Sequence, residues 1–296
     1  MGRITLRKSL FGTAAAFVLT LSVQAQPKLV VQVIVDQMRA EYLQRFNDQW
    51  DPKGGFRTLL DSGYSYANTH YNYIPTYTGP GHASVSTGTT PKYHGIVGND
   101  WLTNTGYEMY CAEDTLVQPV GTSELGSQRS PRNLRALTFS DAIRLYTNRA
   151  GKSFGISVKD RGAIFPAGHF ANGAFWLDEQ LNFVTSTYYQ EQLPRYVQQF
   201  NNREYAKRYA KKNWELELDR RKYNRSLDDE NPFEPEWAQF PHRLKQQIEA
   251  KGIGVLKSTP FGNTLVLDMA LELLKEEDLG KDEHTDFLGI SFSSTD

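Results

Sequence analysis

The feature that most constrains the fold is the apolar run 28–36, KLVVQVIVD, which is rich in β-branched residues and ends on Asp36. An apolar run of this length predicts a strand buried on both faces of a parallel sheet. Ligands in open α/β sheets bind at the carboxyl ends of the strands. The run therefore predicts an α/β fold and makes Asp36 a candidate site residue. The alternative is that Asp36 only caps a following helix, expected over 38–46.

The segment before this strand has the pattern of a signal peptide. Positive residues precede a short apolar run over 10–23, and a small-residue cleavage site, VQA, ends at Ala25. We expect residues 1–25 to be removed and 26–296 to be secreted to the periplasm, with no stable membrane span after cleavage. An uncleaved anchor is the alternative, although the apolar run is short for a span.

Composition indicates a globular protein without a nucleic-acid partner. The chain has 296 residues, of which 39% are hydrophobic, and a formal net charge of −1. This length can bury a sizeable core in one large domain or two. The near-neutral charge gives no indication of nucleic-acid binding.

A second segment, 74–88, concentrates hydroxyls, glycines and prolines around Thr78. Pro75 disfavours a helical conformation at Ile74, whereas Pro80 is tolerated in a first helical turn. Thr78 is therefore expected at or just before a helix start, where free N–H groups and the helix dipole favour an anion such as phosphate. The simpler interpretation is that Thr78 only caps the helix.

Other polar side chains follow predicted strands or lie in loops. Lys159 and Arg161 come after the apolar strand 153–158, and residues i and i+2 of an extended chain point to the same side. The last strand ends on a second carboxylate, Asp296, and Asn99 lies in a glycine-flanked loop. The simpler interpretations are that the two cations lie on a solvated edge and that Asn99 only forms a turn. Together, carboxylates, a hydroxyl and two cations suggest metal-assisted phosphoryl chemistry.

The remaining pattern is helical or cap-like. Apolar spacing predicts helices over 56–63, 133–148 and 264–275. The segment 183–261 is polar, mixed in charge and contains a Pro-rich acidic loop. We interpret it as an inserted cap of helices and long loops rather than as sheet core.

Five motifs in order resemble the alkaline phosphatase superfamily. More narrowly, they resemble secreted bacterial alkaline phosphatases with a Thr nucleophile, relatives of the nucleotide pyrophosphatase/phosphodiesterases. The motifs are VDQM with Asp36, PTYTGPGH with Thr78, GNDW with Asn99, VKDRG with Lys159 and Arg161, and SFSSTD with Asp296. The resemblance covers 28–296 and implies a three-layer α/β sandwich with a mostly parallel central sheet and an inserted cap. We expect this sequence to supply only the N-terminal part of that fold, without its C-terminal half.

The resemblance implies zinc-dependent hydrolysis of phosphate monoesters, with small phosphorylated substrates and a covalent phosphothreonine on Thr78. Two Zn²⁺ ions are implied, one touching Asp36 and Thr78 and the other held first by Asp296. The implied substrate-binding residues are Asn99, Lys159 and Arg161. His82 matches the histidine of the Thr78 motif, and we interpret it as structural.

The same resemblance leaves alternatives. A monoester dianion gains from two extra cations, and the diesterase relatives generally lack such a Lys/Arg pair, so we favour a monoesterase over a phosphodiesterase or nucleotide pyrophosphatase. The histidine-containing metal motifs that follow the Asp296 position in the family are missing. We therefore expect a fragment of a longer enzyme that binds zinc weakly and turns over little substrate alone. A non-catalytic secreted homologue is the other alternative. The C/S-x-P-x-R motif of sulfatases and a G-x-S-x-G elbow are both lacking.

Overall fold

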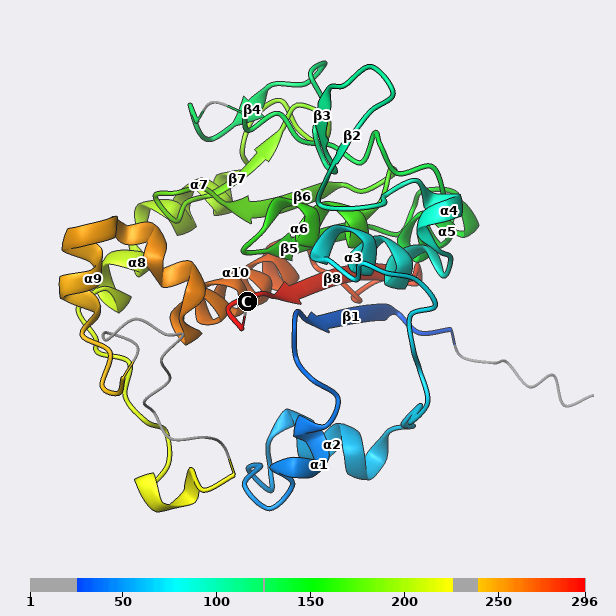
Figure 1. The fold of residues 1–296 in the computed structure, drawn as a ribbon. Coiled ribbons are helices and arrows are strands. Elements are labelled where there is room, and N and C mark those ends of the chain that lie inside the picture. The colour runs from blue at the N-terminus through cyan, green and yellow to red at the C-terminus, as the bar shows by residue number, and fades with distance from the viewer. Residues whose placement is uncertain (1–25, 125, 226–238, 296) are drawn as a thin grey trace, which may run out of the picture.

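The computed structural model describes residues 26–124, 126–225 and 239–295, and its centre is a six-stranded sheet (Figure 1). The strand order is β1-β8-β5-β6-β7-β4, and β2 and β3 form a separate antiparallel pair. β1, β8, β5 and β6 run parallel, whereas β7 and β4 are antiparallel additions. The strands are β1 (Leu29–Val35), β2 (Asp100–Leu102), β3 (Glu108–Tyr110), β4 (Pro119–Val120), β5 (Ser153–Ser157), β6 (Gly173–Leu177), β7 (Phe183–Ser186) and β8 (Asp286–Phe292).

Helices cover both faces of this sheet. One face packs against α6 and α3, and the other packs against α10 with α7 beside it (Figure 1). The α-helices are α1 (Tyr42–Arg45), α2 (Gly55–Ser62), α3 (Thr78–Thr87), α4 (Pro91–His94), α5 (Phe139–Tyr146), α6 (Asp160–Ala167), α7 (Arg195–Asn202), α8 (Tyr205–Tyr209), α9 (Leu244–Lys251) and α10 (Pro260–Glu276). The 3₁₀ helices are η1 (Arg220–Lys222) and η3 (Ile253–Ser258). The predicted α/β fold with a mostly parallel central sheet is confirmed.

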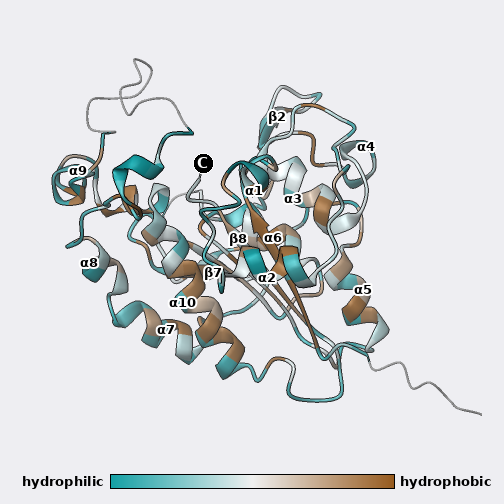
Figure 2. Cartoon of the chain, turned by 90° about the horizontal axis from the view of Figure 1, so that it is seen from below, coloured by the Kyte–Doolittle hydropathy of each residue, from teal (hydrophilic) through white to brown (hydrophobic). Residues whose placement is uncertain are grey.

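Two apolar clusters make the core, one on each sheet face. The larger joins the strands to α7 and α10, with Phe154, Phe175 and Met269 among its buried members. The second joins α6 to α3 and the loop before α5. Figure 2 shows the hydrophobic colouring concentrated on the central strands and on parts of α10. Each face of the central strands is therefore covered by its own apolar layer.

The strand β1 departs from the expectation of burial on both faces. Among the described residues it pairs only with β8, so it is an edge strand, and Val31 and Val33 are 44% and 54% exposed. The apolar pattern of the strand correctly predicted a parallel partner. It was wrong about burial, because no other described strand or helix covers these two side chains.

The close packing of α6 on β5 depends on two glycines. A Cβ at Gly155 would lie 2.0 Å from the main-chain oxygen of Ala163, and one at Gly162 would lie 2.5 Å from the hydroxyl of Ser157. Only glycine permits so close an approach of helix and strand. The start of α6 is thereby held against the carboxyl end of β5.

Several helix boundaries differ from the predictions. The helix expected over 38–46 is reduced to α1, because the chain turns at Gln37, which has φ 60°. The helix expected over 133–148 begins only after Thr138, where a capping box with Asp141 sets its start. Conversely, α10 begins at Pro260, earlier than its apolar spacing indicated. The positions at which these helices begin are set by local turns and capping residues rather than by apolar spacing.

The segment predicted as a cap contributes a strand to the main sheet. Phe183–Ser186 is β7, which pairs with β6 and β4, whereas α7, α8, η1 and α9 follow it outside the sheet. Within the described parts of the chain, none of the helices has the length and hydropathy needed to cross a bilayer. Residues 1–25, the predicted signal peptide, lie outside the described residues.

Candidate active site

The site lies where parallel strands end. Asp36 follows β1 directly, and its N–H donates to the main-chain oxygen of Phe292 at the end of β8, 2.9 Å away. Lys159 follows β5 in the same sheet. Because these strands are parallel, their carboxyl ends meet at one edge. The alternative role of Asp36 as a helix cap is wrong, since the next helix begins at Tyr42, after Glu41.

Thr78 is the first residue of α3, and its hydroxyl points to Asp36. The helix is preceded by Tyr77, and the N-terminus has no side-chain cap. The hydroxyl of Thr78 donates instead to Oδ2 of Asp36 at 3.2 Å, and both residues are at most 9% exposed. The interpretation of Thr78 as a mere cap is therefore wrong. Its hydroxyl is held against a carboxylate at the positive end of a helix.

Asn99 lies beside the same helix start. Its side-chain oxygen accepts a hydrogen bond from the N–H of Gly79 at 2.8 Å. A Cβ at Gly79 would lie 3.2 Å from that oxygen, so glycine allows the loop to pack closely on α3. The oxygen of the Asn99 side chain is used by this hydrogen bond, and its NH₂ group can donate to a ligand.

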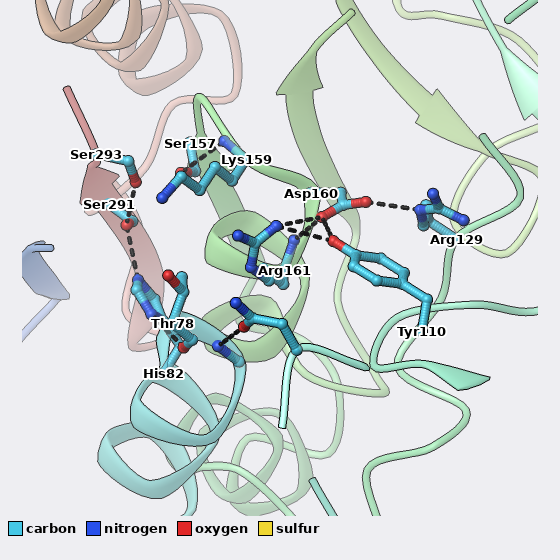
Figure 3. A network of polar contacts seen from close by, with 12 residues as sticks. Thr78, His82, Tyr110, Arg129, Ser157, Lys159, Asp160, Arg161, Ser291 and Ser293 are labelled. Carbon is cyan, nitrogen blue, oxygen red and sulfur yellow. Dashed lines mark hydrogen bonds and ion pairs between the residues drawn. The ribbon is translucent and has the colours of Figure 1, made fainter. Parts of the chain in front are cut away.

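The two cations reach the site from the start of α6. Lys159 is the residue before that helix and Arg161 lies in its first turn, so the predicted extended geometry is wrong. The ammonium of Lys159 lies 3.2 Å from Oδ2 of Asp36, the oxygen that also accepts from Thr78. Figure 3 shows the side chains of Thr78, Lys159 and Arg161 around one space.

His82 ties the Thr78 helix to the sheet. Its Nδ1 lies 2.8 Å from the main-chain oxygen of Thr78, and its Nε2 lies 2.7 Å from the hydroxyl of Ser291 in β8 (Figure 3). A carbonyl oxygen only accepts, so Nδ1 carries the proton and Nε2 accepts from Ser291. Burial lowers the pKa of His82, in keeping with a neutral ring. The contacts agree with a structural role for this residue.

Charges of both signs lie at the site, a buried carboxylate on Asp36 and a partly buried ammonium on Lys159. Burial lowers the pKa of Lys159, and the charge of Asp36 partly opposes that shift. A cavity of about 740 Å³ is lined by Asp36, Thr78, His82 and Asn99, with Tyr71 and Tyr77 at its side, whereas Lys159 and Arg161 line a second cavity of about 510 Å³. The first is large enough for a phosphoryl group and part of its alcohol.

Two described residues could contribute ligands to a metal ion. The Asp36 carboxylate and the Thr78 hydroxyl are hard oxygen donors within 3.2 Å of each other, as two ligands of one ion could be. Within the ranges that the structure describes, no group of three or more His, Cys, Asp or Glu is placed to hold a metal. Asp296 lies outside the described residues, although its neighbour Thr295 donates a hydrogen bond to the main-chain oxygen of Asp36. These two donors fit one side of a metal site but do not complete it.

Comparison with known proteins identifies the family. Residues 30–296 match the family described as type I phosphodiesterase / nucleotide pyrophosphatase. The chain belongs to this family. The predicted resemblance to the alkaline phosphatase superfamily is thus confirmed for nearly all of the described chain.

Three curated relatives each match 92% of this chain. Alkaline phosphatase PafA of Elizabethkingia meningoseptica is 43% identical over 280 residues, which cover 92% of this chain and 51% of PafA. Alkaline phosphatase PhoV of Synechococcus elongatus is 40% identical over 279 residues, which cover 92% of this chain and 50% of PhoV. A protein of Myroides odoratus named calcium-transporting ATPase is also 43% identical, over 92% of this chain and 51% of its own length.

A solved structure of this family gives the same fold. The crystal structure of wild-type PafA superposes with a TM-score of 0.86 at 43% identity, covering 91% of this chain and 53% of PafA. The chain therefore spans about half the length of the curated relatives it matches. These similarities support a hydrolase fold of the alkaline phosphatase type.

Sequence reasoning missed the residues that surround Arg161. Tyr110, Arg129 and Asp160 form a hydrogen-bonded group with it (Figure 3). Asp160 stands between the two predicted cations and could have been singled out from that motif. Tyr110 and Arg129 carry no local signal, because 51 and 32 positions of chain separate them from Arg161.

Proposed function

We propose that the protein hydrolyses phosphate monoesters with Thr78 as the nucleophile. One observation carries the proposal: the hydroxyl of Thr78 and the ammonium of Lys159 both bind the same carboxylate oxygen of Asp36, each at 3.2 Å. A nucleophile, a cation and a candidate metal ligand thus converge at a helix start. Such a place favours a phosphoryl group.

The chain's own residues would bind and orient the substrate. The NH₂ of Asn99 and the main-chain N–H of Thr78 would donate to the non-bridging phosphoryl oxygens, because the N–H of Gly79 already donates to Asn99. Lys159 and Arg161 would offset the charge of the dianion, Arg161 through its planar set of donors. His82 would keep the first turn of α3 in place through the carbonyl of Thr78. Positioning of this kind is the main contribution of a protein to phosphoryl transfer.

The reaction would proceed in two displacements. The oxygen of Thr78 forms a bond to phosphorus while the bond from phosphorus to the alcohol oxygen breaks, and the alcohol leaves with a proton. Water then attacks phosphorus, the bond to the Thr78 oxygen breaks, and inorganic phosphate and the threonine hydroxyl are restored. A divalent cation bound at Asp36 would lower the pKa of a coordinated hydroxyl and stabilise negative charge.

The metals and the location of the protein belong to the same proposal. We propose two Zn²⁺ ions, with Asp36 and Thr78 at one and Asp296 at the other. Further ligands are expected from a chain of the length of the curated relatives. We also propose removal of residues 1–25 and a periplasmic location, on the basis of the sequence pattern at the N-terminus.

Phosphodiester hydrolysis is the second candidate, because the matching family is described as a phosphodiesterase and pyrophosphatase. The two functions differ in substrate charge. A diester carries one negative charge and a second organic substituent, so it gains less from Lys159 and Arg161. The partly buried cations Lys159 and Arg161 therefore favour the monoester.

Hydrolysis of nitrophenyl phosphate and of its bis-nitrophenyl diester, at alkaline pH with zinc, separates the two candidates. The experiment uses the 296-residue chain and the whole protein that its gene encodes. We expect the whole protein to prefer the monoester, and the double variant Lys159→Ala/Arg161→Ala to lose most of that preference. Lys245→Ala, which removes an exposed cation of α9, is the control and keeps the preference. A wild-type preference for the diester would refute the proposal.

A further inference from the structure

Arg161 is held by a neighbouring tyrosine rather than by solvent. Its Nη1 donates to the hydroxyl oxygen of Tyr110 at 3.0 Å, and its side chain is 18% exposed. Its Nε is buried and has no hydrogen-bond partner among the described residues. A guanidinium has five N–H donors, so this one keeps donors for a ligand after Tyr110 has taken one.

Tyr110 is in turn fixed from two sides. Its hydroxyl donates to Oδ1 of Asp160, and the opposite carboxylate oxygen accepts from Nε of Arg129 at 2.6 Å (Figure 3). The guanidinium of Arg129 also lies over the Tyr110 ring, 4.4 Å from its centroid. The tyrosine can therefore neither rotate its hydroxyl away from Asp160 nor move its ring without breaking these contacts.

The direction of the hydrogen bonds follows from this arrangement. Because the hydroxyl hydrogen is used by Asp160, the oxygen of Tyr110 can only accept from Arg161. Burial, and then the charge of Asp160, raise the pKa of Tyr110. The hydroxyl thus keeps its proton at the alkaline pH at which a phosphatase of this kind would work.

We propose that Tyr110 is a positioning residue that holds the Arg161 guanidinium at the phosphoryl oxygens and so favours dianionic over monoanionic phosphate esters. The inference rests on the proposed function, since it assigns Arg161 to phosphate. It extends that function to a residue that touches neither the nucleophile nor the metal ligands. Asp160 and Arg129 act behind Tyr110 by fixing its hydroxyl.

Tyr110→Phe tests the inference, because it removes the hydroxyl and keeps the ring under Arg129. We expect inorganic phosphate to bind the whole protein about tenfold more weakly, as measured by calorimetry, since a hydrogen bond to a charged group is lost. We expect kcat/KM to fall about tenfold for the monoester and less than about threefold for the diester. Tyr189→Phe is the control, because that buried hydroxyl packs on the same core cluster and has no partner among the described residues.

A double-mutant cycle separates positioning from a general structural effect. In an Arg161→Ala background, Tyr110→Phe should weaken phosphate binding no further, because its effect passes through Arg161. A further loss in that background would overturn the inference, as would a single variant that binds phosphate like the wild type. If Tyr110→Phe melts below the assay temperature, the same cycle is measured below its melting temperature, with the same expectations.

The inference and the proposed function can fail separately. A wild-type protein that binds no inorganic phosphate overturns the role of Tyr110. A protein that binds phosphate through Tyr110 and Arg161 but hydrolyses no ester overturns the proposed function and leaves the positioning role standing.

Discussion

Gly155→Ala should destabilise the protein strongly, because the new methyl group has no room between β5 and α6. It would lie 2.0 Å from the main-chain oxygen of Ala163 and 2.8 Å from the Cβ of Ala167. Neither atom is the end of a flexible side chain, so helix or strand must move. Overpacking of a core costs about 1–3 kcal/mol, and we expect about 3 kcal/mol or more here because the obstacle is main chain.

The loss should be visible in both stability and binding. For a protein of this size, about 3 kcal/mol corresponds to a decrease in Tm of about 6–12 °C, measured by circular dichroism. A displaced α6 also carries Lys159 and Arg161 away from Asp36, so phosphate binding should weaken in the folded variant. Gly55→Ala is the control, because a Cβ there meets nothing within 4 Å, and its effect should stay within about 0.5 kcal/mol. A Gly155→Ala protein within about 1 kcal/mol of the wild type would refute this reasoning about helix packing.

Two further predictions concern the hydrogen bonds of His169 and His82. Both ring nitrogens of His169 face acceptors, Asp141 and a main-chain carbonyl, each at 2.9 Å. Burial lowers the pKa of His169, but the hydrogen bonds to Asp141 and to the main-chain oxygen of Leu134, together with the charge of Asp141, outweigh it, and the net shift is upward. The stabilisation is therefore complete below about pH 6.5 and lost as pH rises through the folded-state pKa. In His169→Gln, the midpoint of urea unfolding should depend less on pH across that range than in the wild type. An unchanged dependence on pH would contradict the assignment. Ser291→Ala leaves Nε2 of His82 unpaired and should cost about 1–3 kcal/mol in urea unfolding. Ser86→Ala, which removes a buried hydroxyl without a partner among the described residues, should cost less, and equal losses would refute the role of Ser291.

Much of the site could be predicted because it depends on strand ends and one helix start. The parallel strands bring Asp36 and Lys159 to one edge, as the apolar runs before them indicated. Pro80 and the glycines around it correctly placed Thr78 at a helix start. These features are local in sequence, and the parallel sheet alone brings them together.

The supports of the site could not be predicted in the same way. Tyr110 follows no predicted strand and belongs to no motif. It is the last residue of β3, and its contacts with Asp160 and Arg161 join residues that are about 50 positions apart in the chain. The exposure of Val31 and Val33 could not be predicted either. An apolar pattern indicates that a strand can be buried, but it does not say which elements cover it. Helix ends near Gln37 and Thr138 depended on a turn and a capping box that periodicity does not reveal.

The most direct test of the central claim is the rate of monoester hydrolysis by the whole protein. The rate is measured for the single variant Thr78→Ala and, as a control, for the single variant Thr87→Ala. Both threonines lie in α3, but the hydroxyl of Thr87 donates to the main chain of its own helix. Loss of the nucleophile should lower kcat at least about a thousandfold, whereas Thr87→Ala should retain wild-type activity. A Thr78→Ala protein that keeps more than about a tenth of the wild-type rate would contradict a phosphothreonine mechanism.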